Sequence, residues 1–268
     1  MIVHVSTIIS FTSALLWGLS GTIYGEAVMN KETINSFADY ISFVETHFSR
    51  NHIFRGIHSL NHKLIPKIGR KQYADRCSSD PSKVLDSLQD LEEQAMSDFV
   101  KMSVPHQDLR DIGAWDQWTI GQHHGLPTRF LDWTENPLIA AYFATENAKD
   151  DAAVYVVDRR QFNSQTADLQ DVFSFPDEDD VLLYVPSYIH PRIIAQKGVF
   201  TVHKNPTVPL DETIIDGTPC EVDQLIIPKG KIAEFVEDLD WCGINRSFIY
   251  PGLDGLAHYL DLRAKGGV

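Results

Sequence analysis

The stretch QHHGLPTRFLDWTENPLIAAYFAT, residues 122–145, joins a cluster of polar side chains to an apolar, alanine-rich run. Two adjacent histidines, an arginine and an aspartate lie in its first half, around a Gly-Leu-Pro break. Asn136 and Pro137 then favour a helix start, because asparagine caps a first turn and proline is tolerated there. The pattern predicts a loop that presents polar groups and a helix that anchors them.

The hydrophobic pattern outside this stretch indicates helices mixed with strands. Apolar residues recur every three or four positions from residue 31 and across residues 81–102, and Trp115 and Trp118 open a further helical stretch. A closing helix is expected over residues 231–244, and an acidic surface excursion over 168–180. A buried strand is expected from β-branched content at residues 152–157, a short β-prone segment at residues 51–57, and further strands at residues 198–203 and 223–228. Without an internal repeat or linker, the pattern predicts one α+β domain.

Composition narrows the class of protein. The chain has 268 residues, of which 43% are hydrophobic, so it is long enough to bury a core. A formal net charge of -14 argues against broad, non-specific nucleic-acid binding, although a small basic pocket remains compatible with a nucleic-acid substrate. The three cysteines are scattered and form no CxxC pair, which predicts neither a zinc site nor a disulfide framework. The simplest location is the reducing cytoplasm.

Residues 1–28 form an apolar N-terminal segment with no Lys, Arg, Asp or Glu before Glu26. The segment exceeds the roughly 20 residues that cross a bilayer, but Ser and Thr dilute it and a basic flank is missing. Three interpretations stay open: a start-site artefact with Met29 as the true start, a membrane anchor or signal, and an extra buried helix. Residues 29–268 are expected to form the domain, and membrane contact is expected only if residues 1–28 are an anchor.

Arg55 is the first candidate site residue. It ends an apolar strand in the sequence IFRG and precedes Gly56, which places it at the mouth of a site with an approachable backbone. A guanidinium group binds phosphates and carboxylates through two parallel hydrogen bonds. The alternative interpretation is a surface salt bridge.

The central stretch offers further candidates. His123 and His124 are adjacent and point in different directions, so they do not form the i, i+4 pair of a helical metal site. One of them could orient a substrate or act as a general acid or base, and the alternative is a pair of polar loop histidines. Arg129 and Asp132 are expected to form a buried ion pair that braces the loop. Thr134, at the strand-to-helix junction, could cap the helix or reach a ligand.

Gln196 lies in RIIAQKGVF, residues 192–200, between an apolar run and a glycine. Its amide both donates and accepts hydrogen bonds, which suits a ribose hydroxyl or the edge of a nucleobase. The sequence has no paired-carboxylate motif, Walker loop, GxSxG or GxGxxG, which argues against the commonest enzyme classes.

These motifs together resemble a known family. FRG at residues 54–56, the stretch 122–144, RIIAQKGVF and YPGLDGLA at residues 250–257 occur in the order of the FRG domain. The resemblance spans roughly residues 51–260, and the middle motif is too long for chance.

A second resemblance, to the ADP-ribosyltransferases, concerns the same motifs. IFRG is similar to their first motif, in which an arginine or histidine followed by glycine holds NAD. WTENPLIAAYFA is similar to their second, around the nicotinamide pocket. RIIAQKGVF falls where their third motif belongs, but Gln196 stands where a glutamate is expected. The fold implied is an ADP-ribosyltransferase-like split β-sheet with flanking helices, with Arg55 and Gln196 facing one cleft.

The resemblance also implies roles for individual residues. Arg55, Gln196 and His123 would be the catalytic candidates. The residues implied in NAD binding are Arg55, Gly56, Thr134, Tyr142 and Phe143. A glutamine at position 196 could hold the ribose but could not act as a base. The acidic role would then fall to another residue, or the site would bind NAD without transferring it.

The function implied is that of an NAD-dependent ADP-ribosyltransferase acting on a protein, RNA or DNA, as in a bacterial toxin or phage-defence effector. NAD would be its substrate, and no bound metal is expected. Its partners would be a macromolecular acceptor and an antitoxin or inhibitor. The alternatives are a non-catalytic nucleotide- or partner-binding module and an NAD hydrolase.

Overall fold

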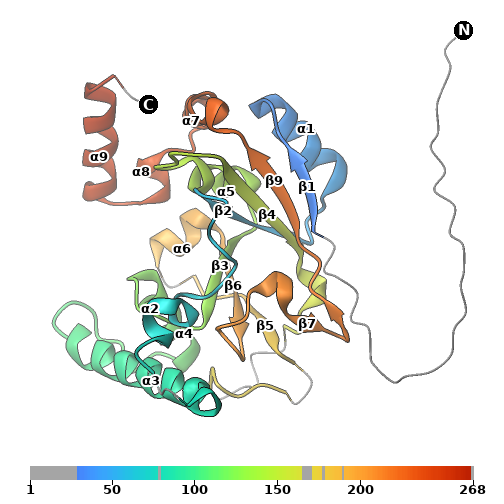
Figure 1. Ribbon diagram of the computed structural model, residues 1–268. Coiled ribbons are helices and arrows are strands. Elements are labelled where there is room, and N and C mark those ends of the chain that lie inside the picture. The colour runs from blue at the N-terminus through green and yellow to red at the C-terminus, as the bar shows by residue number, and fades with distance from the viewer. Residues whose placement is uncertain (1–28, 78–79, 165–170, 177–178, 189, 267–268) are drawn as a thin grey trace, which may run out of the picture.

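The computed structural model describes residues 29–268 except 78–79, 165–170, 177–178, 189 and 267–268 (Figure 1). The apolar segment 1–28 lies outside the described residues, and so do residues 168–170 and 177–178 of the expected acidic excursion at 168–180. Within the described part of the chain, no helix is both long and apolar enough to cross a membrane.

A mixed sheet forms the centre of the described structure (Figure 1). It has seven strands in the order β1-β9-β4-β2-β3-β6-β5, and neighbours are antiparallel except β1 and β9. The strands are β1 (Asn30–Thr33), β2 (His52–Ile57), β3 (Phe130–Thr134), β4 (Ala152–Asp158), β5 (Val181–Tyr184), β6 (Gly198–His203) and β9 (Asp223–Ile227). A separate small hairpin joins β7 (Ile214–Ile215) to β8 (Thr218–Pro219). The predicted α+β class is confirmed.

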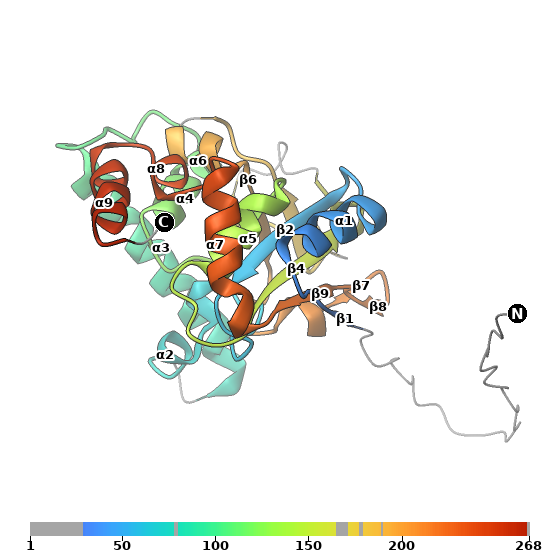
Figure 2. The same ribbon diagram turned by 90° about the horizontal axis from the view of Figure 1, so that it is seen from above.

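Helices cover both halves of this sheet. The helices of the described residues are α1 (Phe37–His47), α2 (Lys71–Ala74), α3 (Val84–Ser103), α4 (Ala114–His123), α5 (Pro137–Thr145), α6 (Pro191–Gln196), α7 (Ile232–Trp241), α8 (Arg246–Ile249) and α9 (Leu253–Ala264). Helices α1, α5 and α7 share one apolar core with β2, β4 and β9 and lie on the same side of the sheet (Figure 2). Helices α3 and α4 pack with β3, β5 and β6. The opposite face of the sheet carries a further core.

The sheet divides between β2 and β3. These strands pair only at Phe54 and Thr134, whereas β2 pairs with β4 along its whole length. A four-stranded half (β1, β9, β4, β2) therefore meets a three-stranded half (β3, β6, β5) at one point. Phe54 and Thr134, the residues paired at this point, both line a pocket.

Helix α5 lies unusually close to β2. A Cβ atom placed on Gly56 would be 1.9 Å from the carbonyl oxygen of Ala140 and 2.4 Å from the amide nitrogen of Ala144. Only glycine allows this contact, because both neighbours are backbone atoms of the helix. The alanines of the AAYFA run are fully buried for the same reason, since small side chains let helix and strand approach.

Several predicted elements are confirmed. The predicted start of α5 is correct: the Asn136 side chain accepts a hydrogen bond from the Leu138 amide at 2.9 Å, and Pro137 is the first helical residue. Two predicted elements were wrong. The helix expected from residue 31 begins only at Phe37, because residues 30–33 pair with β9 as a strand. Helix α7 does not close the chain, because α8 and α9 follow it.

Candidate functional site

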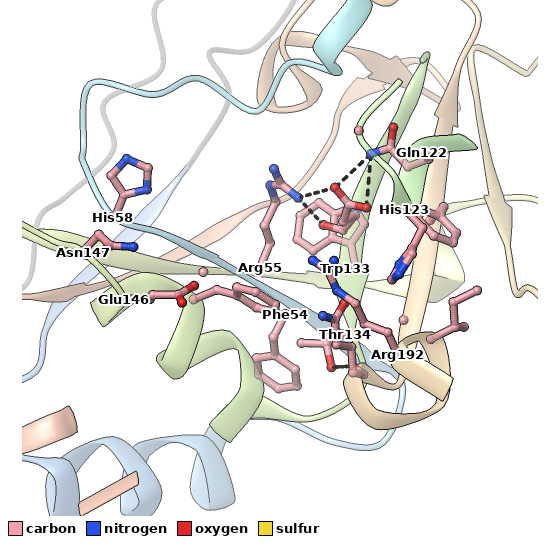
Figure 3. Close-up of a pocket in the computed structure, with 18 residues that line it drawn as sticks. Phe54, Arg55, His58, Gln122, His123, Trp133, Thr134, Glu146, Asn147 and Arg192 are labelled. Atoms are coloured by element: carbon pink, nitrogen blue, oxygen red, sulfur yellow. Dashed lines mark hydrogen bonds and ion pairs between the residues drawn. The ribbon is translucent and has the colours of Figure 1, made fainter. Parts of the chain in front are cut away.

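A pocket of about 530 Å³ opens where the two halves of the sheet separate (Figure 3). Its wall is built from β2, β3, β6, the ends of α4 and α5, and α6. Most of the predicted site residues meet here: Arg55, Gly56, His123, Thr134, Phe143 and Gln196. Tyr142 lies outside the lining. The pocket therefore unites motifs that are far apart in the sequence.

Arg55 reaches into this pocket from β2 (Figure 3). Its Nη1 donates to the Asp132 carbonyl oxygen at 2.5 Å and lies 3.5 Å from Asp132 Oδ2. Gln122 Nε2 donates to both carboxylate oxygens of Asp132, at 3.0 and 3.1 Å. Burial lowers the pKa of Arg55, Asp132 opposes that shift, and Arg70 adds to it. Since an arginine stays protonated in proteins, the pocket contains a fixed cation.

The Arg55 side chain is 17% exposed, and its Nε is buried without a hydrogen-bond partner among the described residues. Such a nitrogen costs free energy unless a partner satisfies it. Arg55 thus combines the two interpretations drawn from the sequence, since it is ion-paired and also lines the pocket.

The ion pair expected between Arg129 and Asp132 does not form. Arg129 instead pairs with Glu92 of α3: Nη2 and Nε both lie 3.1 Å from Glu92 Oε2, and the Arg129 amide donates to Oε1 at 2.5 Å. Both side chains are buried. The reason is strand geometry, since residues three apart along an extended chain point to opposite faces. Asp132 therefore forms its ion pair with Arg55, and Arg129 links the start of β3 to α3.

Thr134 links the predicted motifs rather than offering its hydroxyl to the pocket. Its Oγ1 donates to the Gln196 carbonyl oxygen at 2.6 Å and accepts from the Asn136 amide at 3.1 Å. A second hydrogen bond orients the Gln196 side chain: its Nε2 donates to the carbonyl oxygen of Ile249 in α8 at 3.1 Å. The single donor of the threonine hydroxyl is thus already used, and Thr134 acts by positioning Gln196.

Glu146 is a carboxylate in the pocket wall that the sequence interpretation missed. It follows the apolar run of α5, and its side chain is 17% exposed. Tyr142 donates to its Oε1 and Tyr250 to its Oε2, both at 3.0 Å, while Arg246 forms an ion pair with Oε1. Burial and the nearby Glu146 raise the pKa of Tyr142, and they raise that of Tyr250 to about 12. Both phenols therefore stay protonated and act as hydrogen-bond donors.

Tyr142 therefore contributes to the pocket only through Glu146. It was predicted to contact the ligand, but its hydroxyl holds Glu146 instead. Phe143, its neighbour, does line the pocket.

Arg192 adds a second cation to the pocket wall, from α6 (Figure 3). Its Cζ lies 4.5 Å from the ring centroid of Tyr250, and its Nε is buried without a partner in the described part of the chain. Arg246 also stacks on this ring, at 4.6 Å. Tyr250 of the YPG motif therefore connects the C-terminal helices to both Arg192 and Glu146.

Three histidines gather at one side of the pocket. The ring centroids of His123 and His190 are 4.5 Å apart, and His124 lies 5.1 Å from His123 and 5.8 Å from His190. Burial, Arg192 and the other two histidines lower the pKa of His123 to about 3. His123 is therefore neutral near pH 7 and poorly matched to general acid catalysis there.

The comparisons with known proteins bear on part of the chain. The family model of the FRG domain matches residues 50–153, which confirms the predicted FRG resemblance over that segment. The matched segment contains Arg55, Asp132 and Glu146, but ends before Arg192 and Gln196. No curated protein and no solved structure matches the chain significantly.

Proposed function

We propose, starting from the FRG domain match and the pocket, that this protein binds NAD and transfers ADP-ribose to a macromolecule in the bacterial cytoplasm. One observation carries the proposal. Arg55 and Arg192 reach the same pocket from different elements, each with a buried Nε that has no partner among the described residues. Two guanidinium groups in one pocket suit a ligand with two neighbouring phosphates.

The remaining wall supports a dinucleotide ligand. A volume of about 530 Å³ lies within the range of small-molecule sites, and Phe143 offers an aromatic surface for a planar ring. The Gln196 amide, held by Ile249, is available to a ribose hydroxyl. The division of the sheet at Phe54 and Thr134 is in keeping with the ADP-ribosyltransferase-like split sheet inferred from the motifs.

We assign the acidic role to Glu146. NAD supplies an ADP-ribosyl group: its bond to nicotinamide breaks as the bond to the acceptor forms, nicotinamide leaves as the neutral molecule, and the proton of the acceptor group passes to solvent. Positive charge develops on the ribose in that step, and a preorganised carboxylate stabilises it. Glu146 is held by Arg246, Tyr142 and Tyr250, which fixes its direction before any ligand arrives. Glu146 thus supplies the carboxylate that Gln196 lacks.

The role is that of a toxin or phage-defence effector, with an antitoxin or inhibitor as a partner. The glutamine at position 196 favours a second candidate, a nucleotide-binding module without transfer. Hydrolysis of NAD without an acceptor is the third.

Adenylate-labelled NAD separates these functions. We expect wild-type protein incubated with cell extract to release nicotinamide and to label a macromolecule, which protease, RNase or DNase then identifies. Glu146→Gln should lower labelling by about a hundredfold, a typical cost of losing one transition-state contact. Glu135→Gln is the matched control, because Glu135 is also paired with an arginine, Arg159, but lies outside the pocket lining.

Each outcome selects one function. Nicotinamide release without labelling would indicate a hydrolase, and saturable NAD binding without release would indicate a binding module. Absence of NAD binding would refute the site itself.

A further inference from the structure

The three clustered histidines come from two separate parts of the chain. His123 is the last residue of α4, His124 is its C-cap, and His190 is the N-cap of α6. One ring nitrogen of each lies within 4.8 Å of the others. Among the described residues, no other set of three His, Cys, Asp or Glu side chains is grouped in this way. The adjacency of His123 and His124 in the sequence did not predict this, because the third member is distant.

The spacing is close to that of a metal site. Zn²⁺ binds imidazole nitrogen at about 2.0–2.1 Å, so tetrahedral ligand atoms lie about 3.3 Å apart. The histidine nitrogens would have to approach by up to about 1.5 Å, which rotation about the side-chain torsions supplies. His124 is exposed and the other two are half-buried, so the rings have room to turn.

The ligand set also selects the class of ion. Imidazole nitrogens suit Zn²⁺, Co²⁺, Ni²⁺ and Cu²⁺ rather than Mg²⁺ or Ca²⁺, which prefer oxygen. Three protein ligands leave a fourth position for water or an anionic oxygen, as in catalytic rather than structural zinc sites. His123 lines the pocket, so an ion held here would lie at its rim.

Two features oppose binding and set its strength. The Arg192 amide donates to His190 Nδ1 at 3.3 Å, and a metal-bound neutral imidazole cannot keep that acceptor while its other nitrogen binds the ion. The positive charge of the Arg192 guanidinium also repels a cation here; it adds to burial in lowering the pKa of His123. Binding should therefore disturb the first turn of α6, the helix that carries Arg192 and Gln196.

We propose that His123, His124 and His190 form a site for a divalent transition metal, with Zn²⁺ as the reference ion, at the rim of the pocket. The site rests on the histidine geometry alone and stands whether or not the pocket binds NAD. Through the cap of α6, the bound ion is coupled to Arg192 and Gln196, the polar pocket residues on that helix.

Calorimetric titration of Zn²⁺ into the chelator-treated full-length protein tests this, with Co²⁺ absorption as a second readout. We expect one ion per chain and nitrogen-ligated cobalt bands. His123→Gln, His124→Gln and His190→Asn should each weaken binding by about a hundredfold, since changing even a residue that only hydrogen-bonds to a metal ligand costs about ten- to a hundredfold. Asparagine at position 190 keeps a capping oxygen, so that variant should fold.

His62→Gln is the matched control. His62 is exposed and also lies beside a histidine, since its ring centroid is 4.9 Å from that of His58, but it is outside the cluster. It should bind Zn²⁺ as the wild type does. The proposal is overturned if no stoichiometric binding occurs, if the three cluster variants bind normally, if His62→Gln alone loses binding, or if a thiolate-to-cobalt band shows binding at a cysteine.

Discussion

Gly56→Ala tests the contact that positions one wall of the pocket. The new methyl group would lie 1.9 Å from the Ala140 carbonyl oxygen and 2.4 Å from the Ala144 amide, whereas real Cβ contacts essentially never fall below 3.0 Å. Strand β2 and helix α5 must separate by on the order of 1 Å, and a close-packed core resists such a shift. Overpacking of this kind costs about 1–3 kcal/mol, and backbone neighbours place this case at the upper end.

Urea denaturation followed by circular dichroism measures that cost. About 3 kcal/mol should lower the melting temperature by about 6–12 °C in a chain of this size. NAD binding should weaken as well, because α5 carries Phe143 and leads into Glu146.

Gly198→Ala is the control. A Cβ on Gly198 meets nothing within 4 Å, so its stability should stay within about 0.5 kcal/mol of the wild type. A Gly56→Ala protein as stable as Gly198→Ala would refute the close approach of α5 and β2.

Three further predictions concern ionisable groups. Arg55→Lys should weaken NAD binding about ten- to a hundredfold in calorimetry with an almost unchanged melting temperature, because lysine lacks the planar fork; wild-type affinity would remove Arg55 from the site. Glu92→Ala should destabilise the fold by about 3–5 kcal/mol in urea, because it leaves Arg129 buried without its carboxylate; a loss below about 1 kcal/mol would contradict the buried pair. Burial lowers the pKa of His203 from about 6.5 to about 3. Between these two pH values the histidine is protonated in the unfolded chain but neutral in the native protein. Stability should therefore fall on acidification through that window, by up to about 1.4 kcal/mol per pH unit from this group, and urea midpoints at pH 7 and pH 5 check the sign; a midpoint that is higher at pH 5 would contradict it.

Local patterns predicted the elements that form the site. The short β-prone segment at residues 51–57, the Asn136-Pro137 helix start and the strand after Gln196 are all present, because each depends on neighbours in the sequence. The pocket residues were found through motifs rather than periodicity. Sequence spacing alone did not decide whether Arg55 binds a ligand or forms a surface salt bridge.

Features that depend on distant partners were missed. The polar sequence NKET has no strand alternation, and β1 exists because it pairs with β9 near the other end of the chain. The predicted pair of Arg129 and Asp132 overlooked strand alternation, which places the two side chains on opposite faces. Glu146 directly follows the last residue of α5, and the sequence motif that predicted Tyr142 and Phe143 stops just before it. Arg192 and His190 enter the site through α6, a helix too short to show periodicity.

Calorimetric titration of NAD into the purified wild-type protein tests the central claim most directly. The account predicts saturable binding of one NAD per chain. ADP-ribose should compete with NAD, because it retains both phosphates that Arg55 and Arg192 would hold. Nicotinamide alone should not displace NAD. Absence of saturable binding at millimolar NAD, or competition by nicotinamide but not by ADP-ribose, would contradict it.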